Sequence, residues 1–168
     1  MTPAVTKAFF AGTFNPFTTG HLDIVARGLR MFPGGVTLGI GYNERKGQAD
    51  ADTRVEELKR LFAECPRVEV TAYSDLTATA ARRAGASVIL RGYRNAADAE
   101  YERTLAETNL RLFGIDTALL ATRGELSSVS SSMVRELEHF GVDTSRFRPT
   151  PEECRAACAG EAPTHDKP

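Results

Sequence analysis

The chain has 168 residues, of which 42% are hydrophobic and 26% charged, and its formal net charge is -1. The length is typical of one domain with a substantial core, and the balanced charge gives no overall positive field that would favour nucleic acid. We find no secretory leader and no apolar run of about 18 residues that could span a bilayer. We therefore expect a cytoplasmic protein with neither a nucleic-acid nor a membrane partner.

The first expected unit is a buried strand, a polar loop and a helix. Residues 7–11 are typical of a short buried strand, Gly12 provides the exit turn, and apolar side chains recur at helical spacing over residues 22–32. The loop between them belongs to the segment GTFNPFTTGH, residues 12–21. His21 therefore stands at a helix N-terminus, where free backbone N–H groups favour a phosphate.

The rest of the chain continues to alternate between strands and helices. In order, we expect a strand over 36–42, a helix that opens at 52–56, a strand over 67–73, a helix over 77–84, a strand over 87–90, a helix over 97–113, a strand over 117–122, and helices over 131–140 and 151–159. Thr53 and Glu56 form the Thr-x-x-Glu pattern of a capping box. Repeated βα units with short links predict an α/β fold, a Rossmann-like doubly wound parallel five-stranded sheet with helices on both faces. We assign one domain to residues 1–160 and a disordered tail to residues 161–168, which lack an apolar anchor.

The three cysteines, Cys65, Cys154 and Cys158, are an odd number without paired CxxC motifs. This usage is typical of free thiols in a reducing compartment rather than of a disulfide framework. Cys154 and Cys158 share an expected helix, but no further His or Cys cluster completes a four-ligand metal site. We expect free thiols and no metal bound by the protein.

Ligands of an open α/β sheet bind in the crevice beyond the carboxyl ends of its strands. We expect Thr13, Asn15, Thr18, Thr19 and His21 to face this crevice. A lone histidine is more often a plain polar residue at a helix start. The Gly-Thr turn and the Gly-His pair favour a functional interpretation here.

The segment GTFNPFTTGH resembles the first signature of the nucleotidylyltransferase superfamily, a Gly-Thr/Ser-Phe-Asp/Asn-Pro turn followed by a Gly-His pair. Over about residues 7–149 the chain is most similar to the phosphopantetheine adenylyltransferases, because RGYRNAADAEYE (91–102) and SSVSSSMVREL (127–137) follow in the family's order. The resemblance implies transfer of the adenylyl group of ATP to 4'-phosphopantetheine, giving dephospho-coenzyme A and pyrophosphate, in coenzyme A biosynthesis. It also implies a homohexamer, inhibition by coenzyme A, and Mg²⁺ carried on the triphosphate of ATP.

The resemblance also assigns catalytic roles. His21 would contact the α-phosphate and stabilise the transition state, Thr13 would orient the nucleophilic phosphate and ATP, and Lys46 would bind the incoming phosphate. Arg45 competes with Lys46 for that role. Judged by spacing alone, a loop lysine is better explained as a hydrated charge.

The expected binding residues form two sets. The residues expected to bind phosphopantetheine are Thr13, Lys46, Thr77, Arg91 and Asn109. Those expected to bind ATP are Thr13, Phe14, His21, Gly92, Tyr93, Arg94, Glu102, Leu126, Ser127, Ser128, Val129, Ser130, Ser131 and Ser132. Arg91 would hold the phosphate of phosphopantetheine, because a planar guanidinium suits such an oxyanion. Without the resemblance, the arginines fit a basic turn paired with Asp98 or Glu100 equally well, and the serine run fits a simple helix cap.

Two departures from the family and two rival functions bear on this interpretation. Asn15 stands where most family members have Asp, and Ala11 where many have Pro. The chain has no GxxxxGK[ST] motif of a P-loop enzyme and no complete glycine motif of a Rossmann dehydrogenase. One rival is a nicotinamide-mononucleotide adenylyltransferase, which shares the first motif and tolerates Asn15 but has a different second motif. The other is a catalytically inactive homologue, against which His21, Lys46 and Arg91 argue.

Overall fold

The computed structural model describes residues 5–45 and 47–161, and it contains a parallel five-stranded sheet of order β3-β2-β1-β4-β5. The strands are β1 (Ala8–Gly12), β2 (Val36–Gly41), β3 (Val68–Tyr73), β4 (Val88–Tyr93) and β5 (Asp116–Ala121). From β1 the chain first builds β2 and β3 on one side and then β4 and β5 on the other. This is the predicted doubly wound sheet, and its order reverses between β1 and β4. Lys46 and residues 162–168 of the predicted tail lie outside the described residues.

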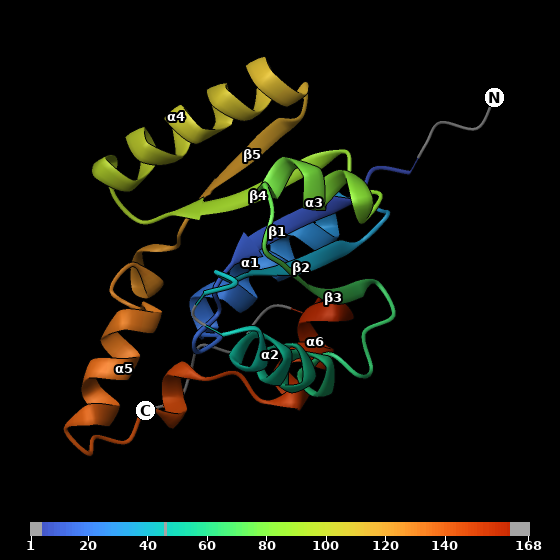
Figure 1. Ribbon diagram of the computed structural model, residues 1–168. Coiled ribbons are helices and arrows are strands. Elements are labelled where there is room, and N and C mark those ends of the chain that lie inside the picture. The colour runs from blue at the N-terminus through green and yellow to red at the C-terminus, as the bar shows by residue number, and fades with distance from the viewer. Residues whose placement is uncertain (1–4, 46, 162–168) are drawn as a thin grey trace.

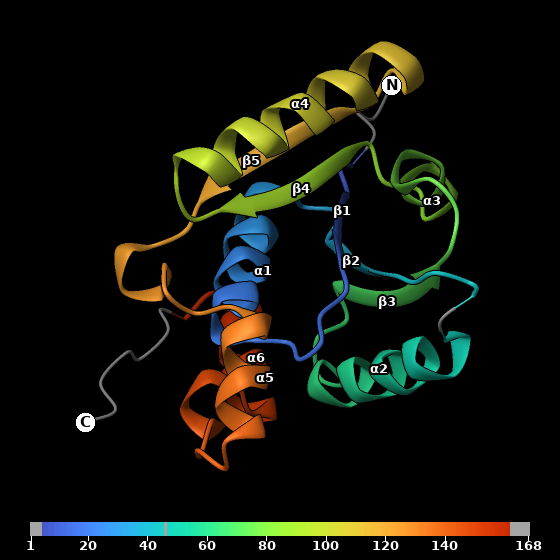
Figure 2. The same cartoon turned by 60° about the vertical axis from the view of Figure 1, so that its left-hand side comes forward.

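Helices cover both faces of the sheet, as predicted (Figures 1 and 2). They are α1 (Thr19–Met31), α2 (Gln48–Leu61), α3 (Thr77–Arg83), α4 (Ala96–Phe113), α5 (Ser131–His139) and α6 (Pro151–Cys158), with single 3-10 turns η1 (Gly124–Leu126) and η2 (Ser145–Phe147). In both views α4 lies along β5, at the edge of the sheet far from α2. No helix in the described part of the chain is both long and apolar enough to cross a bilayer.

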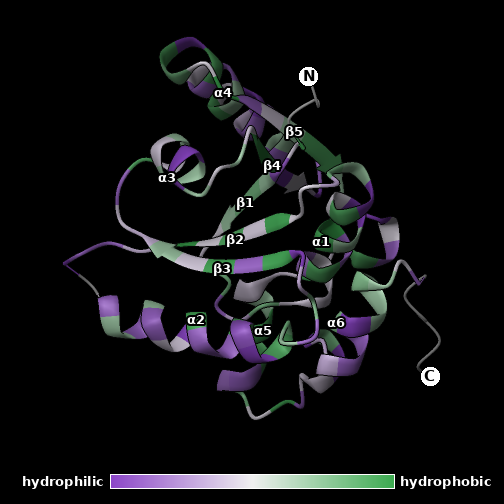
Figure 3. Cartoon of the chain, turned by 90° about the vertical axis from the view of Figure 1, so that its right-hand side faces the viewer, coloured by the Kyte–Doolittle hydropathy of each residue, from purple (hydrophilic) through white to green (hydrophobic). Residues whose placement is uncertain are grey.

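The two faces of the sheet bury two separate clusters because side chains alternate along a strand. Phe10 of β1 joins the larger cluster, which includes apolar residues of α1, α2 and α6, whereas Phe9 joins a smaller, alanine-rich cluster under α3. A Cβ built on Gly39 of β2 would lie 2.1 Å from the Phe9 ring, so the neighbouring strand needs a glycine there. In Figure 3 the central strands are largely apolar, whereas α2 is largely polar.

The start of α2 differs from the prediction. The helix begins at Gln48, before the predicted start at Asp52, and Thr53 lies inside it. The Thr53 hydroxyl donates to the carbonyl of Ala49 at 3.0 Å, so the predicted capping box is wrong. Gly47 precedes the helix with φ 142°, a conformation that glycine adopts without steric cost.

The end of β4 also differs from the prediction. The strand continues beyond the point where its pairing with β1 stops, and the crevice lies there. Pairing with β1 stops at Leu90, but pairing with β5 continues through Arg91, Gly92 and Tyr93. Arg91 therefore lies within β4 rather than at its end. Because β1 and β4 separate after Leu90, the space at the reversal of strand order opens beside Arg91.

The prediction of free thiols is wrong for two of the three cysteines. Cys65 and Cys158 form a disulfide, with their Cα atoms 5.8 Å apart although 93 positions separate them in sequence. The fold brings the turn after α2 against α6, which no local pattern indicates. Cys154 is a free, buried thiol. Burial, together with the nearby charge of Glu153, raises the pKa of Cys154 to about 12.

The disulfide should contribute measurably to stability, because it closes a long loop in the unfolded chain. We expect its reduction to lower the free energy of unfolding by about 2–4 kcal/mol, measured by urea denaturation with and without dithiothreitol. The doubly substituted Cys65→Ser/Cys158→Ser protein is the control and should not respond to the reductant. An unchanged wild-type midpoint on full reduction would contradict this expectation.

Candidate functional site

A cleft of about 290 Å³ occupies the space between the separated ends of β1 and β4. It is lined by Phe10, Ala11, Gly12, Phe14, Thr18, Gly20, His21, Ile24, Arg91, Gly92, Arg94, Thr122, Val129, Ser130, Ser131 and Ser132. None of these described lining residues carries a carboxylate. Thr18 and Ser130 are the N-cap residues of α1 and α5, so two helix N-termini open into the cleft. This combination of cations, hydroxyls and helix ends suits an anion.

His21 is held in one orientation by a capping box with Thr18. The Thr18 backbone N–H donates to Nδ1 of His21 at 3.0 Å, and the His21 backbone N–H donates to the Thr18 hydroxyl at 3.4 Å. Because Nδ1 accepts this hydrogen bond, it carries no proton, and the neutral ring must carry its proton on Nε2. The local helix start therefore fixes the tautomer.

The surroundings of His21 also fix its charge. Its ring packs against Phe14 and Phe17, with centroids 5.0 and 5.3 Å away. Burial, followed by the positive charges of Arg91 and Arg94, lowers the pKa of His21 from 6.5 to about 4. At neutral pH the side chain is thus an uncharged donor through Nε2–H.

Phe14 forms an apolar floor beside the histidine. It is buried and has φ 47°, an unusual conformation for a bulky residue. Its ring approaches Gly12 so closely that a Cβ there would lie 3.0 Å from ring atoms, which explains the glycine. The turn directs Phe14 inward and leaves Asn15 exposed. The expectation that Asn15 faces the crevice is therefore wrong: neither it nor Thr19 lines the cleft.

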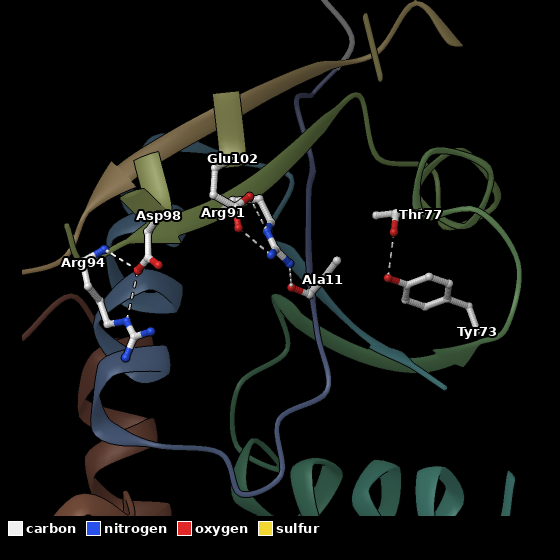
Figure 4. Close-up of polar contacts among 7 residues, drawn as sticks. All are labelled: Ala11, Tyr73, Thr77, Arg91, Arg94, Asp98 and Glu102. Carbon is white, nitrogen blue, oxygen red and sulfur yellow. Dashed lines mark hydrogen bonds and ion pairs between the residues drawn. The ribbon is translucent and has the colours of Figure 1, made fainter. Parts of the chain in front are cut away.

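Arg91 bridges the gap between the two separated strands (Figure 4). Its Nε and Nη2 donate to the two carboxylate oxygens of Glu102 at 2.8 and 2.7 Å, and Nη1 donates to the carbonyl of Ala11 at 2.6 Å. Burial disfavours the Arg91 cation, but the hydrogen bonds and charge of Glu102 hold its pKa above the ordinary value. A guanidinium has more N–H groups than these three bonds use. Arg91 is therefore fixed, charged and still able to donate to a ligand.

The second arginine of the motif, Arg94, has its own acidic partner. Its backbone N–H and Nε both donate to Asp98 of α4 at 3.2 Å. Glu100, the second acidic partner that the sequence suggests, pairs instead with Arg103. Arg94 is thus paired with Asp98 and also lines the cleft.

Two further cavities meet at Arg91. One, of about 570 Å³, is lined by Gly12, Thr13, Gly41, Tyr42, Asn43, Tyr73, Asp75, Thr77 and Arg91. The other, of about 270 Å³, is lined by Leu76, Thr77, Ala78, Ile89, Arg91, Glu102, Leu105, Thr108, Asn109, Phe113 and Thr117. Thr77 borders both, and its hydroxyl lies 2.9 Å from that of Tyr73 (Figure 4). Among the described lining residues, Arg91 is the one that borders both of these cavities and the cleft.

Most of the predicted site residues border these three cavities, but some do not. Tyr93, Leu126, Ser127 and Ser128 are not among their lining residues. Leu126 is buried in the protein, and the Ser127 hydroxyl donates to the carbonyl of Gly124 at 2.8 Å. Lys46 lies outside the described residues.

The prediction missed several lining residues, among them Thr122, and one pairing. Thr122 lines the cleft directly after β5, and the rule that ligands bind beyond strand ends would have indicated it. Glu102 was expected to bind ATP, whereas here its carboxylate holds Arg91. No sequence signal indicates that pairing, because it depends on how α4 packs against β4.

Comparison with known proteins connects this site to a family. A family profile described as cytidylyltransferase-like matches residues 9–137. The phosphopantetheine adenylyltransferase of Porphyromonas gingivalis is 49% identical over 143 residues, which cover 84% of this chain and 93% of that protein. The enzyme of Phocaeicola vulgatus is 49% identical over 144 residues, which cover 85% of this chain and 95% of that protein. The enzyme of Leuconostoc citreum is 38% identical over 144 residues, which cover 84% of this chain and 90% of that protein.

A solved structure supports the fold separately. A crystal structure of a protein with unknown function from Archaeoglobus fulgidus has a TM-score of 0.51 at 15% identity, covering 74% of this chain and 95% of that one. At this identity the likeness concerns the fold alone. The sequence matches go further, because they extend over most of both chains at high identity. The chain belongs to the cytidylyltransferase-like family and, by its similarity to those relatives, to the phosphopantetheine adenylyltransferases.

Proposed function

We propose that this protein transfers the adenylyl group of ATP to 4'-phosphopantetheine, giving dephospho-coenzyme A and pyrophosphate. The observation that carries this proposal is the position of Arg91, where an anion-binding cleft that contains His21 meets two further cavities. Two anionic substrates can thus meet beside a single arginine. The names of the relatives supply the identity of the second substrate.

The cleft would hold the nucleotide. Its triphosphate would lie at the N-termini of α1 and α5, among the hydroxyls of Ser130, Ser131 and Ser132. In the reaction a phosphate oxygen of phosphopantetheine forms a bond to the α-phosphorus of ATP while the bond from that phosphorus to pyrophosphate breaks. Negative charge grows on the α-phosphate oxygens, and the Nε2–H of His21 would stabilise it. No nucleophile from the protein is required.

The two further cavities would hold phosphopantetheine. Arg91 would bind its phosphate, and Glu102 and the Ala11 carbonyl would keep the guanidinium still while it does so. Thr13, Thr77 and Asn109 border the path that the pantetheine arm would follow, and Lys46 would assist at the incoming phosphate. Holding the two reacting groups in line supplies much of the catalysis.

The remaining features of the proposal concern the context of the reaction. Mg²⁺ enters as part of MgATP, since the described lining residues of the cleft offer no carboxylate to hold it.

Exposed Tyr101, Leu110 and Leu112 on α4 support assembly of several copies, which we propose to be a hexamer. Coenzyme A would inhibit by occupying the phosphopantetheine cavities, since it carries the same arm. A cytoplasmic location fits the use of ATP, and there the disulfide would tend to be reduced.

The first test is pyrophosphate release from MgATP with two acceptors, 4'-phosphopantetheine and nicotinamide mononucleotide. We expect release with phosphopantetheine alone. His21→Ala should lower kcat by roughly 100-fold or more, because it removes a donor to the transition state. Release with the mononucleotide would assign the protein to the rival enzyme, and release with neither acceptor would indicate an inactive homologue.

Substitution of Arg91 tests how the substrates are divided between the cavities. Arg91→Ala should raise KM for phosphopantetheine much more than KM for ATP, by roughly 10-fold or more, because a charge-assisted contact to one phosphate is lost. Steady-state kinetics with each substrate varied in turn gives both constants. Equal losses for the two substrates would contradict this assignment.

The charge state of His21 predicts a pH dependence. An unfolded chain binds this proton at a pH of about 6.5, whereas the folded protein binds it only near pH 4. The contribution of His21 to the free energy of unfolding is therefore complete above pH 6.5 and declines as the pH falls toward 4. NMR of the ligand-free protein should show the His21 ring resonance unchanged between pH 8 and about 5. A titration midpoint near 6.5 would contradict a neutral histidine, and His21→Gln identifies the resonance.

A further inference from the structure

Asp23 of α1 is a buried carboxylate that the proposed mechanism does not use. Its side chain is 2% exposed and lies beside two guanidinium groups. Nη1 of Arg27 donates to Oδ2 at 3.1 Å, and Nε of Arg123 lies 2.9 Å from Oδ1. Oδ1 accepts no well-aligned hydrogen bond from the described residues, so its contact with Arg123 is an ion pair rather than a directed bond. A carboxylate this deeply buried is costly unless such cations accompany it.

The two arginines connect Asp23 to the chain just after β5. Nη1 of Arg27 also donates to the carbonyl of Ala121, the last residue of β5, at 2.8 Å. Arg123 is the N-cap residue of η1. Between them, Thr122 lines the cleft, and its backbone N–H donates to the carbonyl of Tyr93 at 2.8 Å. Through Arg27 and Arg123, Asp23 is therefore connected to the chain on both sides of Thr122.

The segment that begins here contributes one wall of the cleft through its two ends, Thr122 and residues 129–132. Residues 122–132 pass through η1 to the N-terminus of α5, beside α1 in Figures 1 and 2. The far end of this segment is held by the Ser131 hydroxyl, which donates to the carbonyl of Pro16 at 2.8 Å. Ser127 and Ser128, in between, are exposed. The near end is held by the backbone hydrogen bond from Thr122 to Tyr93 and by the contacts of Asp23 with Arg27 and Arg123.

We propose that Asp23, with Arg27 and Arg123, is a positioning network that sets the wall formed by residues 122–132 against α1 and His21. The network acts on ATP binding only through this wall, since none of the three residues lines the cleft. The identity of the ligand rests on the proposed function. Because the contact with Arg123 is an ion pair, a positive charge at position 123 should matter more than the shape of the guanidinium.

The test measures MgATP binding by calorimetry and amide hydrogen exchange over residues 122–131. Asp23→Asn and Arg123→Gln should weaken MgATP roughly fivefold or more, whereas Arg123→Lys should stay within about twofold of the unsubstituted protein. Exchange over 122–131 should be faster in the first two variants only. Binding of phosphopantetheine should change less than about twofold in all of them. Arg30→Gln, an exposed substitution on the same helix, is the matched control.

The proposal is overturned if Arg123→Gln leaves both MgATP affinity and exchange unchanged, if it weakens both substrates equally, or if Arg123→Lys fails to restore binding. If Asp23→Asn does not fold, the two Arg123 variants decide, because that side chain is 38% exposed and tolerates substitution better. Failure of the proposed function would show differently, as an unsubstituted protein that does not transfer adenylyl groups. The exchange measurement needs no ligand and still tests the network in that case.

Discussion

The site depends on one interaction, the bridge that Arg91 makes where β1 and β4 separate. Pairing between these strands ends at Leu90, and the carbonyl of Ala11 then accepts a hydrogen bond from Arg91 instead of from a neighbouring strand. A buried carbonyl without a partner is costly, and the guanidinium offsets this cost where the strands separate. Glu102 fixes the same group from α4. The end of the pairing between β1 and β4 thus both opens the cleft and places Arg91 in it. Arg91 lines all three cavities.

The cleft combines positive charge with a neutral histidine. Burial of the ring against Phe14 and Phe17 is the main cause of the low pKa of His21, and the charges of Arg91 and Arg94, which also attract an anion, lower it further. Thr18 determines which ring nitrogen carries the proton. A side chain prepared in this way donates a hydrogen bond without first changing its protonation state. The donor is therefore organised before any substrate arrives.

Two buried carboxylates have related tasks on opposite faces of the sheet. Glu102 of α4 holds Arg91, and Asp23 of α1 holds Arg27 and Arg123. Burying such pairs contributes little net stability, because desolvation offsets much of the attraction between the charges. Their benefit is geometric: each pair locks a helix to the end of a strand that borders the cleft. The geometry of the site thus depends on two carboxylates that hold its arginines, one that lines a cavity, Glu102, and one that lines none of the three, Asp23.

The sequence by itself determined the alternation of strands and helices, the parallel doubly wound sheet, and the position of His21 at the start of α1, because each follows from local periodicity and turn chemistry. Similarity of three motifs also indicated the family. Only the tertiary structure decided that β4 extends through Arg91 to Tyr93, since its register with β5 is a contact between distant segments. The same holds for the disulfide between Cys65 and Cys158 and for the pairing of Asp23 with Arg123. These features depend on which surfaces meet when the helices pack, and that information is spread over residues far apart in the chain.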